Sequence, residues 1–426
     1  MKHALLAAAT IALLSTASAH AETVALVGGN IVDLAGKAPL HDAVVLIDGE
    51  RITAIGPAAS TPVPAGATVV PMHGKWLIPG LMNMHVHLAL NLPGAARIHN
   101  ETPDSMALRT LDNARKSLWS GVTTIRLTGS DAGVDFTVKK AIDAGMFDGP
   151  RIHTAGSSIV ATGGHGKTEV DGPAAFAKAV REQVKRGATW IKIGISGGIS
   201  DTHGDIGASP FTDDELKTAI EVAHRNGVKV TGHTGSPIAS DAAIDAGIDC
   251  FEHGYFLTPT VLGKMKARGV WYVPTIVVSQ SGARAFYAKI GSPDWYLARV
   301  DSVGKAHFRS LRDAISAGVS IALGTDQYPW EPNEGTTATI REAELYVDAG
   351  MTAAQALRAA TIEPARMLGV DKEVGQLKPG YYADIVAVDA DPARDIRALR
   401  TIGFVMKGGK TIRNDASVPS GAKIDR

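Results

Sequence analysis

Two histidines stand two positions apart in an otherwise apolar run, LMNMHVHLAL, which spans residues 81–90. Side chains two positions apart on a β-strand point to the same face, so His85 and His87 could bind one ion together. Imidazole nitrogens are ligands that suit zinc and similar divalent ions. Two histidines this close also occur by chance, so the pair needs partners elsewhere in the chain before it indicates a metal site.

Four further polar side chains lie in or just after apolar, β-rich stretches. Lys192 lies in WIKIGI, His233 ends KVTGH, His253 follows DCFE, and Asp326 follows SIALGT. His253 alone could be a hydrogen-bonded core histidine, and Asp326 alone could cap the next segment. Lys192 is harder to explain as structural, because a buried ammonium needs a partner or a chemical change. The set as a whole favours one metal site.

Eight stretches that could carry these residues recur along the chain, at 82–87, 122–127, 152–155, 190–195, 229–233, 249–252, 271–275 and 320–325. Helical patterns separate most of them. The clearest helix is predicted from Asp213 to Asn226, with a capping box of Thr212 and Glu215 and a Gly227 stop. Strands that alternate with helices predict an α/β fold, a (β/α)8 TIM barrel. The polar residues then meet at the carboxyl ends of the strands, where barrel enzymes have their active sites.

The two ends of the chain have a different character. Short β-rich runs with glycine-centred turns, such as IDGERI, fill residues 22–78, and similar runs return in 371–426. We therefore expect a small β-sandwich domain built from both termini, with the barrel domain inserted between them at 79–370.

Residues 1–21 read as a secretory signal peptide. Lys2 precedes an apolar stretch, and small residues at positions 17, 19 and 21 offer cleavage sites after Ala19 or Ala21. The expected location is periplasmic or secreted. The single cysteine, Cys250, allows no intramolecular disulfide and reads as a small core residue.

The charge balance limits the partners. Lys and Arg together number 43, as do Asp and Glu, so no net field favours nucleic acid or an anionic membrane. No segment after the signal is apolar for the eighteen residues that a membrane span needs. The expected partner is a small-molecule amide or peptide substrate, and the chain is expected to form a homo-oligomer.

The donor set is larger than one open zinc site needs. Four histidines and Asp326 would serve two divalent metal ions, with Zn²⁺ expected, if an anion bridged them. An N6-carboxylated Lys192, the carbamate formed with CO₂, would supply that anion. Such an ion pair activates water and polarises a carbonyl, and Asp326 could take the proton and pass it to the leaving nitrogen.

The ordered motifs MHVH after LIPGLMN, the strand lysine, GH, EHG and GTD resemble the amidohydrolase superfamily, as does KPGYYADIVAVD near the end. The resemblance covers nearly the whole chain after the signal. It implies a buried ion on His85 and His87 and a carboxylated Lys192 bridge. It also implies a more exposed ion on His233 and His253, with Asp326 as ligand and base.

ATGGHG, IKIGISGGISDTHG and EHGYF resemble one subgroup more closely, the Xaa-Pro and Xaa-Arg/Lys dipeptidases and imidazolonepropionase-like proteins. This subgroup includes amidohydrolases that cleave ochratoxin A. The resemblance implies that His165 polarises the substrate carbonyl and that Tyr255 holds its α-carboxylate. For His203, substrate contact and simple solvent exposure are equally open.

Two predicted loops, 196–212 and 276–300, should shape specificity. Aromatic residues there and after Asp326 favour an apolar or aromatic substrate group: Phe286, Tyr287, Trp295, Tyr296, Tyr328 and Trp330. Acidic residues keep a basic substrate side chain open: Asp201, Asp205, Glu331 and Glu334.

Three functions are compared. The first is hydrolysis of the amide to a C-terminal amino acid in dipeptides or N-acyl amino acids, including ochratoxin A with release of phenylalanine. The second is opening of a cyclic amide, as imidazolonepropionases do, which the export signal disfavours. The third is a non-catalytic exported binding protein, which the complete ligand set disfavours.

Overall fold

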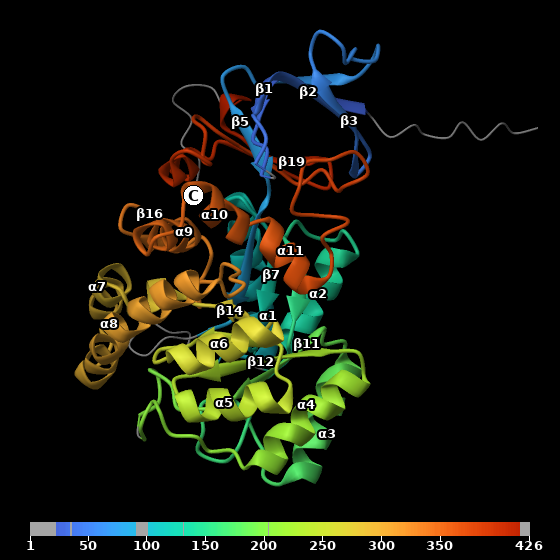
Figure 1. The fold of residues 1–426 in the computed structure, drawn as a ribbon. Helices are drawn as coiled ribbons and strands as arrows, with labels where there is room; N and C mark the ends of the chain where they lie inside the picture. The colour runs from blue at the N-terminus through green and yellow to red at the C-terminus, as the bar shows by residue number, and fades with distance from the viewer. Residues whose placement is uncertain (1–22, 35, 91–100, 131, 203, 418–426) are drawn as a thin grey trace, which may run out of the picture.

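The computed structural model describes residues 23–34, 36–90, 101–130, 132–202 and 204–417. The predicted signal peptide and His203 lie outside the described residues. Figure 1 shows a β-rich end that carries β1–β3 and β19, and an opposite end that carries helices α3, α4 and α5. Within the described part of the chain, no helix is long and apolar enough to cross a membrane.

The α/β part contains parallel strands in two groups. One sheet has the order β6-β7-β8, and another has the order β10-β9-β11-β12-β13-β14. Seven of the eight predicted strands are present, within two residues of the predicted ends. With β9 and β10, which were not predicted, the strands of the two sheets are β6 (Leu81–Val86), β7 (Val122–Leu127), β8 (Arg151–Thr154), β9 (Ile159–Val160), β10 (Thr168–Glu169), β11 (Trp190–Gly194), β12 (Lys229–Thr234), β13 (Cys250–His253) and β14 (Trp271–Val273). Most are buried along their length, which explains their continuous apolar sequences.

The prediction of an eighth strand at 320–325 is wrong, because this segment does not form a regular strand. It makes one isolated parallel bridge, Tyr272 with Ile321. Its backbone still hydrogen-bonds on both sides: Ala322 N–H donates to Tyr272 O at 3.0 Å, and Met84 N–H donates to Leu323 O at 2.7 Å. Gly324 sits so close to β6 that an added Cβ would lie 2.8 Å from the backbone of His85. This close approach and the positive φ of Asp326 (54°) interrupt the regular strand.

Helices cover the strands. They are α1 (Pro103–Trp119), α2 (Val134–Asp143), α3 (Pro173–Arg186), α4 (Asp213–Arg225), α5 (Pro237–Ala246), α6 (Pro259–Arg268), η1 (Ile276–Ser279), α7 (Ser281–Lys289), α8 (Asp294–Ala317), α9 (Ala338–Asp348), α10 (Ala353–Ala359) and α11 (Ile362–Leu368). Helix α4 confirms the predicted helix, with both bonds of the Thr212–Glu215 capping box and Asn226 as C-cap. The prediction of a loop at 276–300 is wrong, because η1, α7 and the start of α8 occupy most of it.

Both ends of the chain contribute to one eight-stranded sheet, β19-β18-β17-β5-β1-β2-β3, with β4 paired to β1. Its strands are β1 (Thr23–Ile31), β2 (Leu40–Asp48), β3 (Arg51–Pro57), β4 (Thr68–Pro71), β5 (Trp76–Pro79), β17 (Ile385–Val388), β18 (Phe404–Lys407) and β19 (Lys410–Asn414). The antiparallel pair Ile78 and Val386 joins the two ends of the chain. Short elements complete the fold: β15 (Pro332–Asn333), β16 (Thr336–Thr337), η2 (Ile396–Thr401) and η3 (Asp415–Ser417).

Candidate active site

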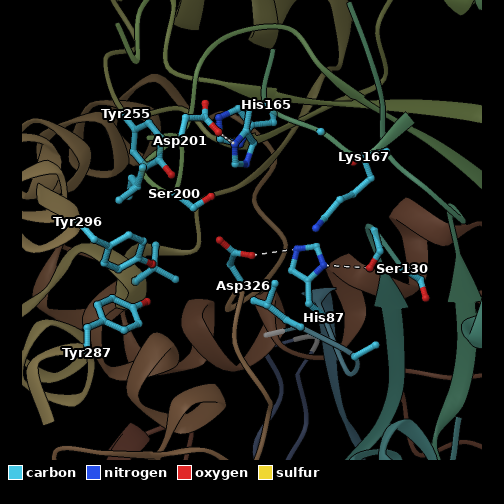
Figure 2. Close-up of a pocket in the computed structure, with 18 residues that line it drawn as sticks. His87, Ser130, His165, Lys167, Ser200, Asp201, Tyr255, Tyr287, Tyr296 and Asp326 are labelled. Atoms are coloured by element: carbon cyan, nitrogen blue, oxygen red, sulfur yellow. Dashed lines mark hydrogen bonds and ion pairs between the residues drawn. The ribbon is translucent and has the colours of Figure 1, made fainter. Parts of the chain in front are cut away.

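A cavity of about 370 Å³ opens at the carboxyl ends of the parallel strands. Figure 2 shows Asp326 and His87 in its middle, with three tyrosines on one side and Lys167 and Ser130 on the other. Its polar and aromatic lining includes His87, Ser130, His165, Lys167, Ser200, Asp201, His233, Tyr255, Tyr287, Tyr296 and Asp326. The cavity therefore joins five of the eight predicted site residues: His87, His165, His233, Tyr255 and Asp326.

His85, His87 and Asp326 come together where β6 ends. Oδ1 of Asp326 lies 3.2 Å from Nε2 of His85 and 3.0 Å from Nε2 of His87, and the two Nε2 atoms are 3.1 Å apart. One ligand atom from each residue falls within a group no wider than 4.8 Å. The spacing is that of donors arranged to share one ion.

The other ring nitrogen of each histidine identifies its tautomer. Nδ1 of His85 lies 2.7 Å from a carboxylate oxygen of Glu252, and Nδ1 of His87 lies 3.0 Å from the carbonyl oxygen of Gly129. Because both oxygens accept, each Nδ1 carries a hydrogen, so Nε2 is the nitrogen of each ring that points at the shared position. Two imidazole nitrogens and a carboxylate that converge in this way form a donor set for a cation. The residues therefore fit a divalent metal ion.

Asp326 is held in an unusual backbone conformation. Its φ of 54° is positive, and its N–H donates to the carbonyl oxygen of His85 at 2.8 Å. Burial alone would raise the pKa of Asp326, but the charges and hydrogen bonds of His85 and His87 hold it well below its usual range. The carboxylate is therefore ionised and able to bind metal or accept a proton.

His233 and His253 form the second part of the cluster. The ring of His253 lies 4.9 Å from that of His85 and 4.5 Å from that of His233, centroid to centroid. Nε2 of His233 donates to Gly197 O at 2.9 Å, while its Nδ1 is buried with no hydrogen-bond partner. Burial lowers the pKa of both rings well below the ordinary value, so each is neutral. His233 Nδ1 thus carries a lone pair that could bind a metal ion.

Lys192 lies in the middle of β11, and its Nζ is buried with no hydrogen-bond partner. Burial lowers the pKa of its amine to about 8, although Glu252 and Asp326 act in the opposite direction. A buried ammonium without a hydrogen bond is costly. The site therefore fits a lysine whose amine is neutral, carboxylated or bound to a metal ion that the neighbouring histidines hold.

Glu252 and Arg126 complete the site and were missed from the sequence. Both are fully buried, and they form an ion pair of 2.5 Å. Burial alone would raise the pKa of Glu252, but Arg126, His85 and Lys192 lower it far below its usual value. The signal was present: VTTIRL and CFEH each place a charged residue inside an apolar strand, as WIKIGI does.

His165 reaches the cavity from the segment between β9 and β10. Its Nδ1 donates to Asp201 Oδ1 at 2.7 Å, and the Gly198 N–H donates to Asp201 Oδ2 at 2.7 Å. The ring of His165 lies 4.2 Å from that of His233. Asp201 therefore positions His165, and each of its carboxylate oxygens already accepts one hydrogen bond.

Tyr255 also lies where the sequence placed it, in the cavity wall. Its ring stacks on His253 with centroids 5.4 Å apart, and burial raises the pKa of its hydroxyl well above the ordinary value. Other expected wall residues lie elsewhere: Phe286, Trp295, Tyr328, Trp330, Asp205, Glu331 and Glu334 do not line the cavity. Of the predicted aromatic wall, Tyr287 and Tyr296 do line it.

Comparison with known proteins gives concordant matches. Residues 76–412 match the model of the amidohydrolase family. The ochratoxinase of Aspergillus niger is 29% identical over 424 residues, which cover 90% of this chain and 85% of that protein. The crystal structure of that ochratoxinase matches with a TM-score of 0.78 and 28% identity, covering 93% of this chain and 96% of the other. A Xaa-Pro dipeptidase with methionine bound in its active site matches with a TM-score of 0.84 and 28% identity, covering 92% and 100%.

Proposed function

This chain belongs to the amidohydrolase family and is a hydrolase of amide bonds, and from that premise we propose that it releases a C-terminal amino acid from dipeptides or N-acyl amino acids. The observation that carries the proposal is the convergence of His85, His87 and Asp326 on one point beside the cavity. Ochratoxin A, an N-acyl phenylalanine, is a candidate substrate because the ochratoxinase relative matches along nearly the whole chain. The tyrosine wall suits an aromatic side chain.

We assign the metal site to six residues: His85, His87, Lys192, His233, His253 and Asp326. They would hold two divalent ions, with Zn²⁺ as the expected metal because imidazole and carboxylate ligands suit it. When bound, the ions would supply Lewis-acid polarisation of the carbonyl and an activated water. Lys192 would bridge them as the N6-carboxylated form, in which the neutral amine adds CO₂ and loses a proton. Its orphaned, buried Nζ supports this role.

Asp326 would act as general base and then as general acid. Its low pKa keeps it ionised to accept the proton of the attacking water, and its position beside His85 and His87 places that proton at the reacting centre. The proton then passes to the leaving nitrogen. A Tyr255 hydroxyl that stays protonated would donate to the α-carboxylate of the substrate.

His165 would polarise the scissile carbonyl. Its Nδ1 hydrogen is committed to Asp201, so a hydrogen bond to a substrate oxygen must come from Nε2. Asp201 accepts the Nδ1 hydrogen and so fixes the orientation of the ring. Asp201 is a positioning residue in this proposal.

The same proposal includes the architecture and the location. Single hydrogen bonds join the two parallel sheets, as in Thr189 N–H to Thr154 O at 2.8 Å, and the 320–325 segment bridges β14 and β6. These contacts support a (β/α)8 barrel at 79–370, with the terminal sheet as a β-sandwich domain.

The sequence of residues 1–21 supports export, and assembly as a homo-oligomer remains a prediction.

The test is a hydrolysis screen with zinc-reconstituted protein, using dipeptides, N-acyl amino acids including ochratoxin A, and a cyclic amide. Release of the C-terminal amino acid is expected, with near-complete loss in Asp326→Asn and an unchanged fold by circular dichroism. A protein that binds no metal and cleaves none of these amides would contradict the proposal. Cleavage of the cyclic amide alone would favour the alternative.

A further inference from the structure

Three contacting side chains, Gln327, Tyr287 and Tyr296, form a row on the tyrosine side of the cavity. The Gln327 Nε2–H donates to the hydroxyl oxygen of Tyr287 at 3.2 Å. The rings of Tyr287 and Tyr296 meet edge to face, with centroids 5.2 Å apart. Gln327 is buried and directly follows Asp326 in the chain. The row therefore connects the position of Asp326 to the ring of Tyr296.

Tyr296 shares the cavity wall with Tyr255. Figure 2 shows both on the side opposite Lys167, and both line the cavity. A tyrosine hydroxyl, with an ordinary pKa of about 10, keeps its hydrogen at neutral pH, so both tyrosines can act as donors.

The Tyr296 hydroxyl is prepared for a strong acceptor. Its ring packs edge to face against Tyr287, which Gln327 holds by a hydrogen bond, so the hydroxyl has a defined position at the cavity wall. A carboxylate has two oxygens and makes stronger hydrogen bonds with neutral donors than an amide carbonyl does. Among the described residues that line the cavity, Lys167 is the only lysine or arginine, and it lies on the side opposite the tyrosines. An anion on the tyrosine side would rely on hydroxyl donors.

Resting on the proposed function, we propose that Tyr296, positioned by Tyr287 and Gln327, donates a second hydrogen bond to the α-carboxylate of the substrate, beside the bond from Tyr255. The pair then selects substrates with a free C-terminal carboxylate. Because the row starts at the residue after Asp326, it also sets the distance between that carboxylate and the general base. Tyr287 and Gln327 are positioning residues and need not touch the substrate.

The experiment compares N-acetyl-phenylalanine with N-acetyl-phenylalaninamide, which lacks the carboxylate, in the zinc-loaded enzyme. The measured quantity is the ratio of kcat/KM for the acid to that for the amide, which cancels losses of folded protein. Tyr296→Phe should lower this ratio about tenfold or more, the effect of one hydrogen bond to a charged group. Tyr287→Phe should lower it by a smaller factor. Tyr381→Phe, whose hydroxyl bonds to Asp371 O outside the cavity, should leave it unchanged.

The double variant tests the row itself. If Tyr287 acts through Tyr296, Tyr287→Phe should change the ratio no further once Tyr296 is phenylalanine. An unchanged ratio in Tyr296→Phe, or full additivity in the double variant, overturns the inference. A larger loss in Lys167→Met than in Tyr296→Phe also overturns it, because the carboxylate then lies on the other side. Failure of the wild-type enzyme to cleave either compound would instead count against the proposed function.

Discussion

A carboxylate oxygen of Glu252 lies 2.7 Å from Nδ1 of His85, and both side chains are almost completely buried. The bond holds the hydrogen of His85 on Nδ1 and directs the Nε2 lone pair to the point where His87 and Asp326 also converge. Arg126 balances the charge of the carboxylate from the other side. The form of His85 that the proposed metal site needs is therefore determined by two residues outside the proposed ligand set, Glu252 and Arg126.

Replacing Glu252 with Gln should weaken metal binding. The amide leaves Arg126 without its ionic partner and no longer favours the Nδ1 hydrogen of His85, and loss of such a partner typically costs about 10- to 100-fold in metal affinity. Competition with a zinc chelator measures the affinity. Glu221→Gln is the matched control, since this exposed residue pairs only with Arg225 on the surface of α4. Equal zinc affinity in Glu252→Gln and wild type would contradict the orienting role.

Replacing Lys192 with Ala should remove metal from the protein, because the proposed bridge between the two ions would be lost. Metal analysis per chain should fall from about two ions, the number expected for a binuclear site of this kind. Added short carboxylic acids should restore part of the metal and part of the activity, since their oxygens can replace the carbamate. Lys229→Ala is a control on the neighbouring strand β12, where the amine donates to Met367 O. Full metal in Lys192→Ala would rule out the bridge.

Much of the site could be predicted because buried parallel strands are nearly continuous apolar runs. A polar residue at the end of such a run is conspicuous, and His85, His233, His253 and Asp326 were found in this way. The Arg126–Glu252 pair was missed because its members are 126 positions apart and meet only when β7 and β13 face each other. Both nevertheless interrupt apolar strands, as Lys192 does.

Predictions failed where packing, not local pattern, decides the structure. The segment 276–300 reads as a loop, but the backbone N–H groups of Ile276 and Val277 donate to the buried carboxyl of Glu342, which stabilises η1 at its start. Tyr328 was expected at the active face, but its hydroxyl donates to Leu90 O at 2.6 Å and its ring stacks on Trp330. Such long-range contacts leave no periodic signal in the sequence.

Glu331 should make the stability of the protein depend on pH. It is 4% exposed, both carboxylate oxygens lack a partner, and burial raises its pKa to about 7 from an ordinary 4.5. The folded protein thus binds this proton more tightly than the unfolded chain does. The protonated Glu331 carboxyl makes its full contribution to folding stability below pH 4.5. This contribution is lost as the pH rises through about 7, and the loss in unfolding free energy is at most about 3 kcal/mol.

Glu331→Gln should remove this part of the pH dependence. Urea unfolding at pH 5 and at pH 8 should give a smaller difference in unfolding free energy for the variant than for the wild type. Glu334→Gln serves as the control, because Glu334 is exposed and pairs with Arg341 nearby. If the pH dependence of Glu331→Gln equals that of the wild type, Glu331 is not the group responsible.

Arg299 on α8 should control the loop that carries Asp201. Its guanidinium donates to the carbonyl oxygens of Gly198, Ile199 and Gly204, at 2.7, 3.2 and 2.9 Å. Arg299→Met keeps much of the side-chain volume and removes all of these bonds. The loop then samples more conformations, so Asp201 positions His165 less often and kcat/KM should fall about tenfold, the effect expected from losing one or two bonds to a charged group.

Faster amide hydrogen exchange over residues 198–202, with an unchanged metal content, would link that loss of activity to the loop. Arg284→Met is the matched control, since it removes an exposed arginine of α7 that pairs with Asp301 on α8. Both variants lose a positive charge near α8, but only Arg299 contacts the active-site loop. Equal kinetics in Arg299→Met and Arg284→Met would mean that the loop holds Asp201 without the arginine.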